Sequence, residues 1–522
     1  MQRIIIYDTT LRDGSQTEGV SYTVNDKIKI THKLDDLGVH YIEGGWPGSN
    51  PKDKEYFAHF KGKKLKNAVI TAFGSTRRAK TPTAKDANIR ALIQSGTKTI
   101  CIFGKSWDLH VTDVIKTSLE ENIRMIYDSV HYLKKQKKEV FYDAEHFFDG
   151  FKNNPEYALK TVLTAQEAGA DCIIFCDTNG GTLPSEVYKI ISSIKHHFDV
   201  NLGIHCHHDM EMGVANSIAA VEAGCMQIQG TFNGLGERCG NANLATIIGI
   251  LQTKMKLECV PKSSLDKLMD TCYFISEISN SIIPNNAAFI GHSAFAHKGG
   301  VHIDAMMKNP LAYEHINPDL VGNHRRFITS ELAGKMPIVT KAQQMDVVLD
   351  KKSAQTKKLM KQLQAKEHGG YQFEAADASF ELFLKRQLKK YKPFYKLESF
   401  RTYSEKRLDG RVFAEATVRL SVEGEEKYAA VQGDGPVDAL DKALRLALTP
   451  FYPKLEEMRL ADYKVRVLDT KEGTGAKVRV LIESQDEHDS WTTVGVHENI
   501  IEASFEALTD AIEYKLLKDL KK

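Results

Sequence analysis

Short apolar segments alternate with longer amphipathic ones in the first half of the chain. Eight of the apolar segments are rich in β-branched residues, as is typical of buried parallel strands. They cover residues 3–7, 41–45, 68–73, 99–103, 139–143, 171–176, 201–205 and 226–230. Helical spacing of apolar residues marks the segments between them, such as residues 27–37, 119–134, 157–168 and 185–198. Eight strands, each followed by a helix, predict a TIM (β/α)8 barrel of the α/β class.

Polar residues gather where these predicted strands end. They are Asp8, Arg12, Asp13, Glu43, Glu145, Asp177, Thr178, His205, His207, Asn233 and Glu237. TIM-barrel enzymes carry their active sites at the carboxyl ends of the strands. An open doubly wound sheet would gather such residues mainly at one switch point rather than around a circle, so we favour the barrel.

The pattern changes after residue 271. We expect a catalytic barrel at residues 1–271, a helical linker region at residues 272–390 and a small α+β domain at residues 391–522. The charged amphipathic stretch at residues 346–367 is best interpreted as a solvated helix in the linker.

The last domain contains a weak internal repeat. Each copy is predicted as two strands followed by a helix, a ββα unit that cannot bury its own apolar face. The copies cover residues 416–422, 427–431 and 436–448, and then residues 477–482, 490–496 and 500–516. We expect the two copies to pack on one another or on a second chain.

Composition narrows the classes of protein that remain. The 522 residues carry a formal net charge of +2, which gives no reason to expect nucleic acid as a partner. The eight cysteines lie mostly in apolar segments and are expected to be reduced thiols. No segment has the length and apolarity of a membrane span or a signal peptide, so we expect a cytoplasmic protein.

Two histidines at the end of the seventh strand are candidate metal ligands. In Gly203-Ile-His-Cys-His-His-Asp209, His205 and His207 point to the same side of the strand, while Cys206 points away. A carboxylate would complete a two-histidine, one-carboxylate site. Asp13 is the best candidate for it, His208 is a competing ligand by sequence, and satisfied core or loop histidines are the alternative interpretation.

The first strand leads into Asp8-Thr-Thr-Leu-Arg-Asp-Gly14. Arg12 and Asp13 could form a purely structural ion pair. With a metal present, Asp13 would be a ligand and Arg12 would face negative charge that develops on a substrate oxygen.

Three motifs together resemble a known family. The segment from Asp8 to Gly14, the pair His205-x-His207, and Asn233-Gly-Leu-Gly-Glu-Arg-Cys-Gly-Asn241 are similar to those of the 2-isopropylmalate, homocitrate and citramalate synthases, relatives of hydroxymethylglutaryl-CoA lyase. The resemblance extends over essentially the whole chain, including the linker and the C-terminal repeat. It implies an acyltransferase that condenses acetyl-CoA with an α-keto acid in branched-chain amino-acid biosynthesis.

The resemblance also implies roles for single residues. Asp13, His205 and His207 would bind a divalent metal (Mn²⁺, Mg²⁺, Co²⁺ or Zn²⁺), with Asn241 completing or supporting the site. Arg12 would contact the keto-acid oxygen, Thr178 the keto-acid carboxylate, and Glu145 would be the catalytic glutamate. His302, in Gly299-Gly-Val-His302, would be contributed to the active site by the partner subunit of a homodimer.

The chain departs from the family pattern at two places. His146 follows Glu145 where several relatives have an acidic residue, so the local acid–base network could differ. No tyrosine after Val321-Gly-Asn323 matches the one that some relatives place beside the partner histidine.

The choice of keto acid depends on the pocket. Glu43-Gly-Gly-Trp46 resembles the pyruvate-using branch of the family, and Trp46 could restrict the pocket or simply pack at the barrel rim. Pyruvate is the expected substrate and 2-oxoisovalerate the alternative, since one or two residues can switch such a preference. For 2-oxoglutarate, Lys105 and His110 are the available residues near the fourth strand.

A lyase and an amino-acid sensor are the two further alternatives. A lyase that runs similar chemistry backwards needs no C-terminal repeat, and an amino-acid sensor on a degenerate barrel needs no complete catalytic set. The C-terminal domain can still bind an end product, for which we expect isoleucine. Gly433-Asp-Gly435 and Gly495-Val-His497 are candidate positions near that site, with plain turn chemistry as the alternative.

Overall fold

Eight parallel strands close into a barrel in strict sequence order. The computed structural model describes residues 3–327, 353–373, 376–388, 391–468, 475–487 and 489–520. The strands are β1 (Ile5–Asp8), β2 (Tyr41–Gly45), β3 (Val69–Ser75), β4 (Thr99–Lys105), β5 (Glu139–Glu145), β6 (Cys172–Asp177), β7 (Asn201–Cys206) and β8 (Gln227–Gly230). β1 pairs with β8 from Ile5↔Gln227 to Asp8↔Gly230, which closes the barrel and confirms the predicted fold class.

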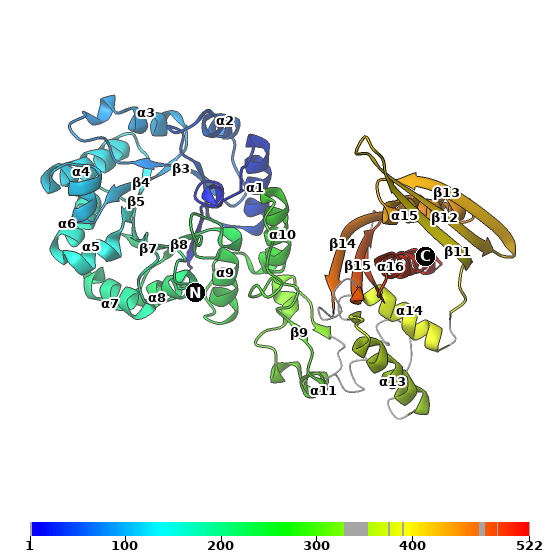
Figure 1. Cartoon of the computed structure of the whole chain (residues 1–522). Coiled ribbons are helices and arrows are strands. Elements are labelled where there is room, and N and C mark those ends of the chain that lie inside the picture. Colours follow the sequence, from blue (N-terminus) through cyan, green and yellow to red (C-terminus); the bar gives the residue numbers. More distant parts are fainter. Residues whose placement is uncertain are drawn as a thin grey trace. The chain divides into compact units, whose positions relative to one another are not determined.

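Helices surround the barrel, as Figure 1 shows in blue to green. They are α1 (Val24–Leu37), α2 (Pro51–Phe60), α3 (Ala87–Gln94), α4 (Leu119–Lys135), α5 (Phe147–Asn153), α6 (Pro155–Glu167), α7 (Pro184–Ile194), α8 (Gly213–Ala223), α9 (Leu244–Thr253) and α10 (Leu268–Ser279). Local sequence explains where several begin. The Thr23 hydroxyl accepts from the Asp26 amide in a capping box before α1, and Asn154 caps α6 with proline at its first position.

Aromatic and smaller apolar side chains pack inside the barrel, so the barrel is a packed core rather than a channel. They are Tyr7, Phe73, Cys101, Phe141, Cys172, Ile174 and Cys176. All eight cysteines lie in the described part of the chain without a disulfide, and seven are buried.

The chain divides into two compact units. The first comprises Met1–Phe295 and His315–Arg325, and the second comprises Ala296–Glu314 and Arg326–Lys522. The linker predicted at residues 272–390 thus contributes to both units, and its boundaries remain a prediction. Of the predicted solvated helix, α13 covers Ala354–His368, and residues 346–352 lie outside the described part of the chain.

The second unit contains two similar sheets, each covered by a helix. One has β11 (Lys396–Lys406), β12 (Val412–Val422) and β13 (Glu425–Gly433) with α15 (Pro436–Leu448). The other has β14 (Arg459–Val467), β15 (Val478–Gln485) and β16 (Ser490–His497) with α16 (Ile500–Asp519) (Figure 1). Both contribute to one apolar core, in which Phe400 stacks on Phe505 with ring centroids 4.3 Å apart.

The predicted ββα repeat was wrong by one strand in each copy. β11 and β14 are edge strands whose residues are mostly exposed, so they lack the alternation of apolar and polar residues that marks β12 and β15. Gly495-Val-His497 also lies within β16 rather than in a turn before the helix. Each repeat is a three-stranded antiparallel sheet followed by a helix.

Within the described residues, no helix combines the length and apolarity needed to cross a membrane.

Candidate active site

Asp13, His205 and His207 converge at the rim of the barrel. Their ligand atoms all lie within 4.8 Å of one another, and Nε2 of His205 is 3.5 Å from Oδ2 of Asp13. Asp13 lies just after β1, whereas His205 is in β7 and His207 follows it. Cys206 belongs to the core outside the sheet, as alternation along the strand predicts. The geometry is that of a two-histidine, one-carboxylate metal site.

Asn241 lies beside His207, with which it forms an isolated β-bridge. Its Nδ2 donates to the Leu235 carbonyl over 3.1 Å. Its Oδ1, like Nδ1 of His207, is buried and has no hydrogen-bond partner among the described residues. Burying such an atom is costly unless something binds it, so the unpartnered amide oxygen of Asn241 beside His207 fits a divalent cation. His208, the competing candidate, instead accepts a hydrogen bond from the Gly213 amide.

Glycine is required at position 236 beside this amide. Gly236 has φ +152°, and a Cβ there would come within 2.2 Å of Nδ2 of Asn241. A side chain would therefore displace the amide that lies next to His207.

Electrostatics favour the charge states that a metal requires. Burial would raise the pKa of Asp13, but Arg12 and the two histidines lower it well below its usual range. Burial lowers the pKa of His207 from 6.5 to about 4. Burial also opposes protonation of His205, although Asp13 holds its pKa above the usual value. A carboxylate thus faces one readily neutral histidine before any cation binds.

Arg12 is held between two carboxylates. Its Nε donates to Oε1 of Glu43 over 2.5 Å, and Nη1 lies 3.1 Å from Oδ2 of Asp13. Glu43 is fully buried and also accepts from the Tyr7 hydroxyl over 2.6 Å. The guanidinium carbon lies 3.7 Å from the centre of the Phe73 ring. Arg12 is fixed in position yet keeps 16% of its side chain exposed, so it can meet a ligand.

Glu145 and Thr178 lie at the ends of neighbouring strands, β5 and β6. Glu145 forms an ion pair with Lys105 of β4. The Thr178 hydroxyl accepts from the His146 amide over 2.9 Å, which leaves its own hydrogen to donate elsewhere. Because Lys105 already pairs with Glu145, it is not a spare cation for the second carboxylate of 2-oxoglutarate.

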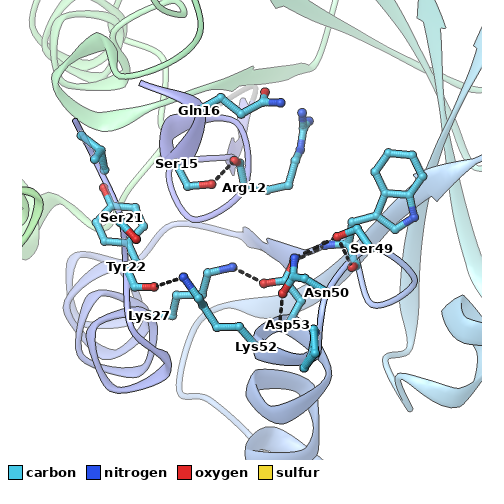
Figure 2. A pocket seen from close by; sticks show the side chains of 13 residues that line it. Arg12, Ser15, Gln16, Ser21, Tyr22, Lys27, Ser49, Asn50, Lys52 and Asp53 are labelled. Atoms are coloured by element: carbon cyan, nitrogen blue, oxygen red, sulfur yellow. Dashed lines mark hydrogen bonds and ion pairs between the residues drawn. The ribbon is translucent and has the colours of Figure 1, made fainter. Parts of the chain in front are cut away.

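A cavity of about 700 Å³ adjoins Arg12 (Figure 2). Its walls come from the loop after β1, the start of α1 and the turn between β2 and α2. Figure 2 shows Lys27 directed at Asp53, 2.5 Å away, and Lys52 at the Tyr22 carbonyl. Trp46 also lines the cavity, as does Arg12, whose guanidinium lies beside Asp13.

Trp46 is fixed at the barrel rim. Its indole N–H donates to Asn88 over 2.7 Å, and its ring lies edge-on to Phe73 and Phe103. The Arg12 guanidinium lies over the ring of the same Phe73. Trp46 thus packs at the rim and also belongs to the cavity wall that includes Arg12, and its role in restricting the pocket stays a prediction.

His302 lies in the other compact unit, on α11 (Gly300–Lys308). It is exposed, and its ring stacks on Tyr313 with centroids 4.2 Å apart. The barrel cluster of Asp13, Arg12, His205, His207 and Asn241 forms without it.

Sequence reasoning missed three buried residues around the site: Glu43 as the anchor of Arg12, and Gln229 and Asp143 behind His205. A signal was present, because Gln227 and Gln229 alternate with Ile228 in a strand that should be apolar on both faces. Their partners come from other strands, so the contacts follow only once the barrel closes.

Three family models together match most of the chain. The HMGL-like family model matches residues 3–275, the homocitrate synthase post-HMGL domain-like model residues 289–368, and the LeuA allosteric (dimerisation) domain residues 374–516. The chain is 54% identical to the (R)-citramalate synthase of Aquifex aeolicus (strain VF5), over 99% of this chain and 98% of the relative. It is 52% identical to that of Geobacter sulfurreducens, over the same shares. Identity to the 2-isopropylmalate synthase of Methanocaldococcus jannaschii is 33%, over 99% and 95%.

Proposed function

The chain belongs to the HMGL-like family and, within it, to the (R)-citramalate synthases, and from this premise we propose that it condenses acetyl-CoA with pyruvate and water to give (R)-citramalate and CoA. The observation that carries the proposal is full-length identity above one half to relatives of that name, against one third for the 2-isopropylmalate synthase. The reaction would serve isoleucine biosynthesis in the cytoplasm.

Asp13, His205 and His207 would hold the divalent cation, with Oδ1 of Asn241 next to it. The convergence of the three side chains and the unpartnered buried oxygen of Asn241 support this assignment. A bound cation would act as a Lewis acid that makes the keto carbon of pyruvate more electrophilic. Nitrogen and oxygen ligands of this kind accept Mn²⁺, Mg²⁺, Co²⁺ or Zn²⁺.

Arg12 and Thr178 would orient the keto acid. Thr178 donates its hydroxyl hydrogen to the pyruvate carboxylate, because its oxygen already accepts from the His146 amide. Arg12 donates to the keto oxygen, and that hydrogen bond strengthens as the oxygen gains negative charge during attack. Since Glu43 and Phe73 fix the guanidinium, little reorganisation is needed when the charge develops.

Glu145 is the candidate base that removes a proton from the methyl group of acetyl-CoA. Its ion pair with Lys105 holds the side chain at the end of β5. The resulting enolate attacks the keto carbon, and water then hydrolyses the thioester, which releases CoA and makes the condensation effectively irreversible.

Trp46 is the candidate for excluding larger keto acids. Its ring, edge-on to Phe73 and Phe103, narrows the rim beside Arg12, where a methyl group needs less room than an isopropyl group.

His302 would complete the site from a partner subunit of a homodimer. The match to the LeuA dimerisation domain supports a dimer, and the exposure of His302 on α11 is consistent with a role toward another surface.

The C-terminal domain would bind isoleucine as a feedback inhibitor, since this region matches an allosteric domain. Isoleucine should inhibit the full chain and lose its effect when residues 391–522 are removed. A truncated enzyme that remains active and still responds to isoleucine would place the effector site elsewhere.

The substrate assignment is tested with a panel of keto acids. The purified, Mn²⁺-loaded protein is incubated with acetyl-CoA and pyruvate, 2-oxoisovalerate or 2-oxoglutarate, and free thiol is followed. We expect kcat/KM to be highest with pyruvate, by about 10-fold or more, because pocket differences of one or two methylene groups are worth about 1–3 kcal/mol. A higher value with 2-oxoisovalerate would assign the enzyme to leucine biosynthesis instead.

A further inference from the structure

A chain of hydrogen bonds runs from His205 into the core of the barrel. Nδ1 of His205 lies 3.0 Å from Oε1 of Gln229, which is fully buried in β8. Nε2 of Gln229 donates to Oδ1 of Asp143 over 3.0 Å. The Cys101 thiol donates to the same oxygen over 3.1 Å. The four residues come from β7, β8, β5 and β4, so the chain crosses the inside of the barrel.

These contacts determine which way the Gln229 amide faces. The structure places Nε2 of Gln229 at Oδ1 of Asp143, an oxygen that also accepts from the Cys101 thiol, and a carboxylate oxygen can only accept. The amide must therefore present its NH₂ group to Asp143 and its carbonyl to His205.

The amide in turn determines the tautomer of His205. A carbonyl oxygen can only accept, so Nδ1 of His205 must carry the hydrogen. In the neutral ring the lone pair is then on Nε2, the atom that faces Asp13 at 3.5 Å. A metal-binding histidine normally donates its other ring N–H in this way, which fixes the ring and increases the basicity of the ligand.

We propose that Gln229 and Asp143 are positioning residues that hold His205 in the tautomer and orientation needed to bind the metal. The inference rests on the metal site of the proposed function, and it assigns two residues outside that site to its assembly. Loss of such a hydrogen-bond partner typically weakens metal binding about 10- to 100-fold.

Gln227 offers a matched control. It lies two residues earlier in the same strand and is equally buried, but its side-chain amide has no hydrogen-bond partner among the described residues. Methionine resembles glutamine in shape and adapts to core gaps, so Gln229→Met and Gln227→Met make the same change at two positions of one strand.

A double variant tests the donor–acceptor logic itself. In Q229E/D143N the new carboxylate can accept from His205 and from the amide of the residue at 143, so both hydrogen bonds return with donor and acceptor exchanged between positions 229 and 143. The buried charge is conserved. The rescue does not depend on restoring the original side chains.

The test measures Mn²⁺ affinity of the metal-stripped full-length protein by titration calorimetry, without keto acid or acetyl-CoA. We expect Q229M to bind about 10- to 100-fold more weakly than wild type, Q227M to bind like wild type, and Q229E/D143N to recover most of the loss. Thermal unfolding of each metal-free variant checks the fold. If Q229M does not fold, D143L takes its place. It removes the hydrogen-bond acceptor of Gln229, so it should bind Mn²⁺ more weakly than Q229E/D143N does.

Three results would overturn the inference: wild-type affinity in Q229M, an equal loss in Q227M, or a double variant as weak as Q229M. A wild-type protein that binds no divalent metal would remove both the inference and the proposed site. If the wild type binds metal but does not use pyruvate, the role proposed for Gln229 and Asp143 still holds and the proposed substrate is wrong.

Discussion

At the scale of one residue, the contacts of Arg12 explain why this position needs an arginine rather than a lysine. Its guanidinium bonds Glu43 through Nε, approaches Asp13 through Nη1 and stacks on Phe73. A planar fork of donors can make these contacts together, whereas an ammonium is a point charge. Arg12 therefore links the buried carboxylate of Glu43 to Asp13, one of the proposed metal ligands.

We expect Arg12→Lys to lower kcat with pyruvate about 100- to 1,000-fold, the usual cost of losing a donor to a developing oxyanion. The lysine also leaves part of the buried Glu43 carboxylate without its partner. Thiol release under saturating substrates measures the effect. Arg90→Lys, on the exposed side of α3, is the control and should leave kcat unchanged. A decrease of less than 10-fold in R12K would remove Arg12 from the reaction.

The residues of the site differed in how well the sequence predicted them. Asp13, His205 and His207 follow from strand ends and alternation, and Asn241 from the family resemblance alone. Glu43, Gln229 and Asp143 act through partners in other segments of the barrel, 24 to 86 residues away along the chain. Periodicity identifies the face on which such residues lie but not the residue that meets them.

The elements were predicted where their periodicity was strong. All eight barrel strands form within two residues of the predicted bounds, because buried parallel strands are almost uniformly apolar. β11 and β14 were missed because solvent covers most of their side chains, which removes the pattern. The helices α15 and α16 begin where the sequence predicts, at Pro436 and Ile500.

Gly433 and Gly495 occupy equivalent positions in the two C-terminal repeats. A Cβ on Gly433 would lie 2.5 Å from the Ala439 amide, and one on Gly495 would lie 2.0 Å from the Ala503 carbonyl. Each alanine is the fourth residue of the helix that follows its sheet. Both glycines therefore allow a strand to approach the first turn of its own helix, which explains these positions through packing.

Gly495→Ala should destabilise the C-terminal domain by about 1–3 kcal/mol, because the added methyl group meets backbone that cannot move freely. The thermal-unfolding midpoint of the full chain measures this. Gly475→Ala is the control, because Gly475 is exposed and no heavy atom lies within 4 Å of its Cβ position, and it should change stability by less than about 0.5 kcal/mol. Equal midpoints for both variants would show that the close approach at Gly495 is absent in solution.

At the scale of the whole molecule, the proposed catalytic residues belong to both compact units. Arg12, Glu145, Thr178 and the metal cluster are in the first unit, whereas His302 is in the second. If His302 acts in a partner's barrel, two defects placed on different chains can compensate each other.

Co-expression of Asp13→Asn and His302→Ala chains tests this. Each homodimer should be nearly inactive, whereas a mixed dimer has one barrel with intact Asp13 that receives His302 from the other chain. Random assembly should restore up to about a quarter of wild-type activity, since half the dimers are mixed and each has one intact site. Two different affinity tags establish that mixed dimers form, and inactive mixed dimers would contradict the exchange of His302.

The proposed function depends on one reaction, citramalate formation, at one metal site. The decisive measurement is citramalate formation from acetyl-CoA and pyruvate by the metal-stripped protein, before and after addition of Mn²⁺, for wild type and Asp13→Asn. We expect the wild type to form (R)-citramalate only after metal is added, and the variant to form little with or without it, because the carboxylate of the two-histidine site is lost. Wild-type turnover that is independent of metal, or no citramalate at all from the metal-loaded enzyme, would contradict the account.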